Sequence, residues 1–174
     1  MEIRFLDLRT VGEGDLSRWR GWLPEKRRHE IDGMAQPRPH LCGEGLVREM
    51  LAKKLGVAPE EIEITRNPYG KPLVEGAYFS LSHSGDWAVC AVDDEAVGID
   101  LERVRERVPE QLSRRLGTDD PAEFCALWTA VEARVKCAGS TVVRWREFLT
   151  DPEGLSTEGV EAPEGYRCSV CRKR

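Results

Sequence analysis

The 174-residue sequence has no long hydrophobic segment, and its longest uninterrupted apolar run extends only from Trp87 to Val92. A membrane-spanning helix needs about 20 apolar residues, so no membrane span is predicted. The first residues, Met1 to Phe5, mix acidic and basic side chains and contain no signal-peptide core. Repeats of fixed period and low-complexity tracts are also absent. These absences argue against membrane, secreted and fibrous proteins and predict a globular protein of the cytoplasm.

An excess of basic charge is also absent, because the net charge is −5. This balance argues against a general nucleic-acid-binding protein. The charge is unevenly distributed: residues 18–54 carry nine Lys/Arg and five Asp/Glu, whereas residues 75–139 carry seven and thirteen. A basic segment beside an acidic one could bind a phosphorylated ligand together with a cation, although ordinary surface charge is the simpler explanation.

Six cysteines are present, and without a secretion signal we expect them to be free thiols. Cys168 and Cys171 form the single CxxC motif, within an alternating stretch that predicts a strand. Residues three apart in a strand point to opposite faces, so these two thiols could not bind one zinc ion. No second CxxC or histidine pair accompanies them, and we therefore expect neither a zinc site nor a redox site here.

The hydrophobic pattern mixes helices and strands without a regular βαβ alternation, which favours the α+β class. Strands are expected over residues 2–8, 62–64, 77–82, 87–92, 97–102 and 166–171. Helices are expected to begin at Pro24, to extend over residues 40–55, and to extend over residues 121–138. The last has the strongest start signal, an Asp120 cap followed by Pro121 and Glu123. Residues 103–118 show no clear pattern.

Asp100 and Glu102 leave the same face of the strand expected over residues 97–102, because side chains two apart share a face. Two ionised carboxylates this close repel each other unless they share a proton or a cation. Mg²⁺, which prefers oxygen ligands, is one solution. Ion pairing with Arg103 or Arg105 on a solvated face is the alternative.

The helix expected over residues 121–138 adds a third carboxylate. At 100° per residue its apolar side chains form one stripe, and Glu132 and Lys136 lie together on one shoulder of it. The two side chains form an i,i+4 pair in the favourable order, worth a few tenths of a kcal/mol on a surface. Either this is a surface ion pair, or Glu132 completes a site with Asp100 and Glu102.

Ser82, His83 and Ser84 end a predicted strand, a position from which side chains often reach ligands. His83 could act as a base or as a donor to a phosphate. A Ser/His/Asp hydrolase is the alternative, but the G-x-S-x-G motif is absent, and adjacent Ser and His in a strand point to opposite faces.

Two further segments carry cations suited to phosphate. Lys71 stands between Gly70 and Pro72 at the end of a turn that begins at Asn67, and a basic cluster extends from Lys26 to His29. Lys and Arg side chains both bind phosphates well. By themselves such runs are more often solvated surface.

Taken in order, these stretches resemble the phosphopantetheinyl transferases of the Sfp type. The matching segments are residues 23–27, 43–48, 69–72, 79–84, 97–102 and 128–139. No single motif decides the matter, but the ordered series GKP, F-x-x-SHS, GID-x-E and W-x-x-x-EA-x-x-K-x-x-G is specific. The resemblance covers most of residues 23–139.

The resemblance implies an α+β fold of two similar halves packed as a pseudo-dimer within one monomeric chain. The halves would be residues 1–96, with the coenzyme A phosphate contacts, and residues 97–174, with the metal site. The implied reaction is Mg²⁺-dependent transfer of the 4′-phosphopantetheine arm of coenzyme A to a serine of an apo acyl or peptidyl carrier protein. The second product would be 3′,5′-ADP.

The motif positions also imply a role for each candidate residue. Mg²⁺ would be held by Asp100, Glu102 and Glu132. The reacting phosphate would be contacted by Lys136, other coenzyme A phosphates by Lys71, Ser82 and His83, and the adenosine phosphate end by Lys26 and His29. Three carboxylates with a metal ion would offset the charge of the pyrophosphate and polarise the bond that breaks.

The sequence departs from the family pattern at three places. Val131 stands where the family usually has Lys, in the middle of the apolar stripe. The family's general base is a Glu between Glu102 and Trp128, but that segment is short here and Glu123 lies 180° from Glu132 around the helix. Asp120, or the adjacent Asp119, fits the base better. The C-terminal part is also short, so its half is expected to lack edge strands.

These departures leave two alternatives to an efficient transferase. One is a degenerate member of the family that binds coenzyme A or the carrier protein with little transfer. The other is a metal-dependent phosphate-ester hydrolase that uses the same carboxylates.

Overall fold

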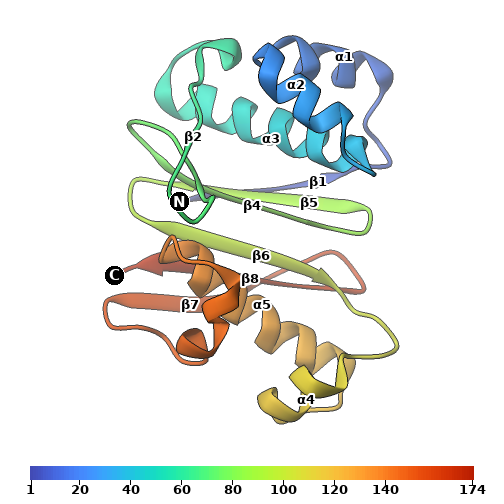
Figure 1. Cartoon of the computed structure of the whole chain (residues 1–174), viewed down its shortest axis with the longest axis vertical. Helices are drawn as coiled ribbons and strands as arrows, with labels where there is room; N and C mark the ends of the chain where they lie inside the picture. Colours follow the sequence, from blue (N-terminus) through green and yellow to red (C-terminus); the bar gives the residue numbers. More distant parts are fainter.

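The computed structural model describes all 174 residues and contains two three-stranded antiparallel sheets, one in each half of the chain (Figure 1). The N-terminal half contains β1 (Glu2–Asp7), α1 (Glu13–Gly21), α2 (Glu25–Asp32), α3 (Pro37–Leu55), β4 (Tyr78–Ser84) and β5 (Trp87–Asp93). A 3-10 turn (Pro59–Glu61) and a two-stranded ribbon of β2 (Thr65–Arg66) and β3 (Pro72–Leu73) connect α3 to β4. No helix combines the length and apolar composition that a membrane crossing requires.

The C-terminal half repeats the chain order of the first. It contains β6 (Val97–Arg103), α4 (Glu110–Leu116), α5 (Pro121–Cys137), a 3-10 segment (Val142–Phe148), β7 (Leu155–Val160) and β8 (Tyr166–Lys173). In both sheets the last strand of the half occupies the centre, with strand orders β1-β5-β4 and β6-β8-β7. The α+β class is confirmed, and the shared strand order is consistent with two similar halves.

The two long helices begin and end where local signals place them. α3 begins at Pro37, three residues before the expected start, because Pro37 and Pro39 fit within a first turn whose N–H groups need no intrahelical partner. It ends at Gly56, whose φ of 70° is the left-handed conformation that glycine favours. In α5 the carboxylate of Asp120 accepts the Glu123 N–H at 2.7 Å, which confirms the predicted cap.

Two expectations about the secondary structure are wrong, and one helix lies where the sequence shows no clear pattern. Residues 62–64 form no strand, and the carbonyl of Ile62 instead accepts a hydrogen bond from the buried Arg48. Helix α4 was not predicted. Strand β7 was not predicted either, so the C-terminal half does have an edge strand. The polar sequence Leu-Ser-Thr-Glu-Gly-Val of β7 shows no clear alternation, because an edge strand buries little of either face.

The hydrophobic core is divided by the sheets. One cluster lies between the N-terminal sheet and α1–α3, and a second joins the other face of β5 to β6 and β8. All six cysteines are free and buried. Cys168 belongs to the cluster between the halves, whereas Cys171 packs against α5, so the two thiols lie on opposite faces of β8 as expected.

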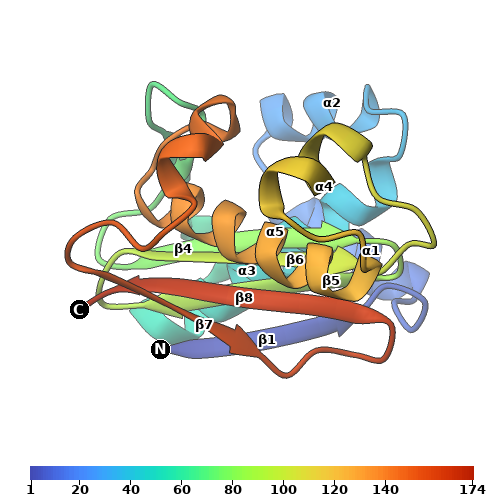
Figure 2. The same cartoon turned by 90° about the horizontal axis from the view of Figure 1, so that it is seen from below.

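Helix α5 lies along β6 and β8, as Figure 2 shows. Its close approach to β6 depends on Gly98, where a Cβ atom would lie 2.1 Å from the carbonyl oxygen of Ala133 and 2.3 Å from the amide nitrogen of Cys137. Only a residue without a side chain fits at this position. This contact sets the distance between Asp100 on β6 and Lys136 on α5.

Candidate functional site

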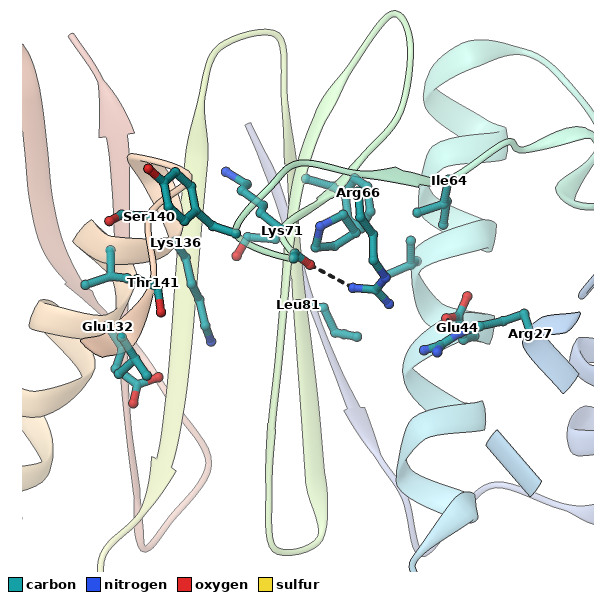
Figure 3. Close-up of a pocket in the computed structure, with 18 residues that line it drawn as sticks. Arg27, Glu44, Ile64, Arg66, Lys71, Leu81, Glu132, Lys136, Ser140 and Thr141 are labelled. Atoms are coloured by element: carbon teal, nitrogen blue, oxygen red, sulfur yellow. Dashed lines mark hydrogen bonds and ion pairs between the residues drawn. The ribbon is translucent and has the colours of Figure 1, made fainter. Parts of the chain in front are cut away.

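A cavity of about 430 Å³ lies between the two halves and is lined by side chains from both (Figure 3). Its N-terminal wall includes Arg27, Glu44, Arg66, Lys71 and Leu81, and its C-terminal wall includes Glu132, Lys136, Ser140 and Thr141. Three of the candidate residues, Lys71, Glu132 and Lys136, therefore meet at one cavity although they come from two separate segments, the loop before β3 and helix α5. The cavity contains both cationic and carboxylate groups, as a phosphate site with a cation would require.

Asp100 does not line this cavity and is only 3% exposed, but it bonds to Lys136, which does. Its Oδ1 accepts hydrogen bonds from the Lys136 ammonium at 2.6 Å and from the Ser82 hydroxyl at 2.7 Å. Its Oδ2 is buried and has no hydrogen-bond partner. A buried polar oxygen without a partner is costly, so this atom is a candidate ligand for a cation.

The two glutamates of the site are electrostatically linked to Asp100. Burial, followed by the charge of Asp100, raises the pKa of Glu102. The same two causes raise the pKa of Glu132 to about 7, although the ammonium of Lys136 opposes the rise. The three carboxylates thus repel one another, with a single ammonium group close to them.

The structure contains no preformed group of three acidic, histidine or cysteine side chains arranged around one metal position. The donor chemistry nevertheless fits a hard divalent cation, because the oxygens are carboxylates, they repel one another, and one is buried without a partner. Asp100, Glu102 and Glu132 are thus suitable ligands by type and charge. The ammonium of Lys136 already pairs with Oδ1 of Asp100.

Ser82, which was expected to contact a phosphate, makes its hydrogen bonds within the protein. Its side chain is buried, and its hydroxyl donates to Asp100 and accepts from the Leu101 N–H at 3.3 Å. Both bonds lie within the protein, so the structure shows a hydroxyl that holds a carboxylate rather than one that faces the cavity.

His83 is exposed near the end of β4, next to His40. The sequence did not indicate His40 as a site residue. The ring of His83 meets the ring of His40 edge-on, with 5.0 Å between the centroids. Partial desolvation lowers the pKa of His83, as do the neighbouring His40 and Lys136. His40 lies in the first turn of α3, and no motif spacing in the sequence links it to His83.

The cationic residues of the N-terminal half divide into two groups. Lys26 and His29 are exposed on α2 and do not line the cavity, whereas Arg27 between them does. Arg27 pairs with Glu44 at 2.6 Å, and Arg66 donates to the carbonyl of Gly70 at 2.8 Å. Sequence reasoning missed Arg66 as a site residue, because it belongs to no charged run.

Lys71 is half-buried at the end of the predicted turn. Its ammonium donates to the carbonyl of Val97 at 3.2 Å, a contact that joins the loop to the first residue of β6. Burial lowers the pKa of this ammonium. Lys71 therefore combines a cavity position with a fixed contact to the opposite half.

The structure places Asp120 far from Glu132 along α5. Asp120 caps α5, about 18 Å along the helix axis from Glu132 at 1.5 Å per residue. The adjacent Asp119 accepts from the Ser113 hydroxyl at 2.6 Å, away from the cavity. In the structure Asp120 caps α5 and Asp119 bonds to Ser113, and the role of Asp120 as the base stays a prediction.

Val131 lies in the apolar stripe, as expected. It is 2% exposed and packs in a cluster with Val135, Trp145 and Phe148. The side chain at this position faces the core, so a lysine contact to a phosphate is absent here.

Comparisons with known proteins agree with these features. Residues 26–95 match a family model described as 4′-phosphopantetheinyl transferase, N-terminal. The chain is 32% identical over 158 residues to the 4′-phosphopantetheinyl transferase gsp of Aneurinibacillus migulanus, which covers 75% of this chain and 67% of the relative. It is 35% identical over 114 residues to the 4′-phosphopantetheinyl transferase Sfp of Bacillus subtilis, or 57% of this chain and 51% of the relative.

A third relative matches more of the chain at lower identity. The 4′-phosphopantetheinyl transferase HetI of Nostoc sp. is 29% identical over 175 residues, which covers 85% of this chain and 70% of the relative. The chain thus spans between 51% and 70% of the length of these three relatives.

Proposed function

Because this chain belongs to the 4′-phosphopantetheinyl transferase family, we propose that it transfers the 4′-phosphopantetheine arm of coenzyme A to a serine of an apo acyl or peptidyl carrier protein, with release of 3′,5′-ADP. One observation supports this most: a cavity between the halves brings Lys71 and Lys136 together with Glu132, and Lys136 bonds to Asp100. Ammonium groups can bind a pyrophosphate, while carboxylates can hold the cation that accompanies it.

Asp100, Glu102 and Glu132 are the proposed ligands of Mg²⁺. When bound, the ion would offset pyrophosphate charge and polarise the bond that breaks. Lys136 forms its hydrogen bond with Asp100 at the wall of the cavity, so its ammonium is positioned to contact the reacting phosphate. Lys71 is held at the same cavity by its bond to Val97.

The nucleophile in this proposal is the serine of the carrier protein. The hydroxyls of Ser82 and Ser84 are committed to Asp100 and Glu102, and Cys90 is fully buried with a pKa raised to about 12. Direct in-line attack by the carrier hydroxyl needs only positioning, charge stabilisation and a proton acceptor. The phosphate–oxygen bond to 3′,5′-ADP breaks as the bond to serine forms.

The phosphates at the nucleotide end are assigned to the N-terminal half, residues 1–96. Lys26, His29 and His83 are exposed and free to contact a phosphate, while Lys71 and Arg27 line the cavity itself. The C-terminal half, residues 97–174, supplies the carboxylates and Lys136. Since both walls of the cavity belong to one chain, we propose a monomer, and the six free thiols favour the reducing cytoplasm.

The test is to incubate the protein with coenzyme A, Mg²⁺ and an apo carrier protein, and to measure the carrier by intact mass spectrometry. We expect the carrier to gain one phosphopantetheine group, and a chelator to prevent the gain. A degenerate member of the family would bind coenzyme A and leave the carrier unmodified. A hydrolase would cleave coenzyme A without any carrier present.

A further inference from the structure

Three serines of β4 replace the main-chain hydrogen bonds that would normally join neighbouring strands. β4 and β6 belong to different sheets, yet they lie against each other at the junction of the halves. The hydroxyls of Ser80, Ser82 and Ser84 accept the N–H groups of three alternate β6 residues: Ile99 at 3.0 Å, Leu101 at 3.3 Å and Arg103 at 3.1 Å. All three serines are buried, so water does not supply these bonds.

Two of the three hydroxyls also donate to a carboxylate of β6. Ser82 donates to Asp100 at 2.7 Å, and Ser84 donates to Glu102 at 3.1 Å. A hydroxyl has one proton to donate, and its oxygen can accept at the same time. Since the β6 amide occupies the acceptor side, the proton of each serine is directed to the carboxylate one residue before that amide.

Ser80 makes the same contact without the carboxylate. The residue that precedes its partner Ile99 is Gly98, which has no side chain to accept a proton. The serine ladder, defined here as Ser80, Ser82 and Ser84, thus contains an internal control. One serine bonds only to the backbone of β6, and two bond to the backbone and to a proposed metal ligand.

We propose that Ser82 and Ser84 are positioning residues that fix the orientation of Asp100 and Glu102 for cation binding, and that Ser80, which also lines the cavity, bonds only to the backbone of β6. This inference rests on the proposed function, because it assigns the two carboxylates to the cation. The same two serines would then both join β4 to β6 and orient the carboxylates. Groups that orient metal ligands typically change metal affinity about 10- to 100-fold when they are removed.

The test compares Ser80→Ala, Ser82→Ala and Ser84→Ala in the full chain with coenzyme A present, using Mn²⁺ as the probe and its electron paramagnetic resonance signal to measure binding. Each variant loses a bond to a β6 amide, so we expect all three to lower the melting temperature. We expect only Ser82→Ala and Ser84→Ala to weaken Mn²⁺ binding, by about 10-fold or more. Ser84→Thr keeps the hydroxyl near the end of the strand and should restore the affinity.

Equal Mn²⁺ affinity in the wild type and all three variants would overturn the proposal, as would an equal loss in Ser80→Ala. If Ser82→Ala does not fold, Ser84→Ala at the end of β4 provides the same comparison. A second measurement separates this inference from the proposed function. The carboxyl ¹³C resonances of Asp100 and Glu102, recorded without metal at one pH, should move in Ser82→Ala and Ser84→Ala respectively and stay unchanged in Ser80→Ala. If the wild type binds no Mn²⁺, the metal assignment and the proposal fail together, while the resonances still show whether the serines orient the carboxylates.

Discussion

At the scale of single residues, the burial of Glu132 beside Asp100 should make the stability of the protein depend on pH. The pKa of Glu132 is raised from 4.5 to about 7 in the folded state, so between these values the folded protein binds more protons than the unfolded chain. The contribution of Glu132 to stability is therefore greatest below pH 4.5, and it falls by about 3 kcal/mol as the pH rises through 7.

Glu132→Gln should remove this contribution and make the metal-free protein more stable than the wild type at pH 8. Urea denaturation at pH 5 and pH 8 in the presence of a chelator measures the difference. Glu123→Gln, on the opposite side of α5, is the control and should keep the wild-type profile. If the difference in stability between pH 5 and pH 8 is the same in Glu132→Gln and in the wild type, burial does not raise the pKa of Glu132.

The pair of Lys136 and Asp100 should contribute to stability far more than an exposed pair of the same length. Lys136→Met would leave the 3% exposed Asp100 without its ammonium partner, and we expect a loss of about 3 kcal/mol, the lower end of the range for breaking a buried pair. Lys54→Met is the matched control, because Lys54 pairs with Asp94 at the same 2.6 Å on the surface. Its loss should stay below about 1 kcal/mol. Equal losses in urea denaturation would contradict a buried role for Lys136.

At the scale of elements, substitutions of Asp120 at the start of α5 can distinguish a structural role from a catalytic one. Asn caps helices about as well as Asp, whereas Ala does not. Asp120→Ala should therefore cost about 0.5–2 kcal/mol of stability, and Asp120→Asn should keep both the stability and the transfer rate. The rate, measured with an apo carrier across pH 6–9, decides between the roles. Loss of transfer in a stable Asp120→Asn variant would restore Asp120 as the base.

The packing of α5 on β6 leads to a second prediction at this scale. Gly98→Ala would place a Cβ atom 2.1 Å from the backbone of α5, so the helix must move away from β6. We expect a loss of about 1–3 kcal/mol or more, together with weaker transfer, because Lys136 moves with the helix. Gly159→Ala in β7 is the matched control, since nothing lies within 4 Å of its added Cβ. Thermal denaturation of both variants should show the contrast, and similar melting temperatures would contradict it.

At the scale of the whole molecule, the exposed basic residues of the N-terminal half, Lys26, His29 and His83, should determine the affinity for coenzyme A. Removal of one charge-assisted phosphate contact costs about 1.5–3 kcal/mol, so Lys26→Ala and His83→Ala should each weaken coenzyme A binding about 10- to 100-fold. Lys53→Ala, an exposed lysine that pairs with Glu2, should leave affinity unchanged in calorimetry. If the wild type binds dephospho-coenzyme A, which lacks the 3′-phosphate, as tightly as coenzyme A, the assignment of Lys26 and His29 is wrong.

The sequence by itself determined the features that depend on neighbours along the chain. The Asp120 cap, the stop at Gly56, the shared face of Asp100 and Glu102 and the buried place of Val131 follow from capping and periodicity, which act over one or two turns. The ordered motifs were enough to indicate the family. These signals do not require knowledge of the tertiary structure.

Only the tertiary structure decided which groups meet across the junction of the halves. The bonds of Asp100 to Lys136 and Ser82 join three separate elements, β6, α5 and β4. Arg27 rather than Lys26 lines the cavity because of the side of α2 that faces it. Strand β7 exists because β8 offers it a hydrogen-bonding edge, not because its own sequence favours a strand. Such contacts depend on how buried faces pack over long sequence separations, and local propensity carries no information about that packing.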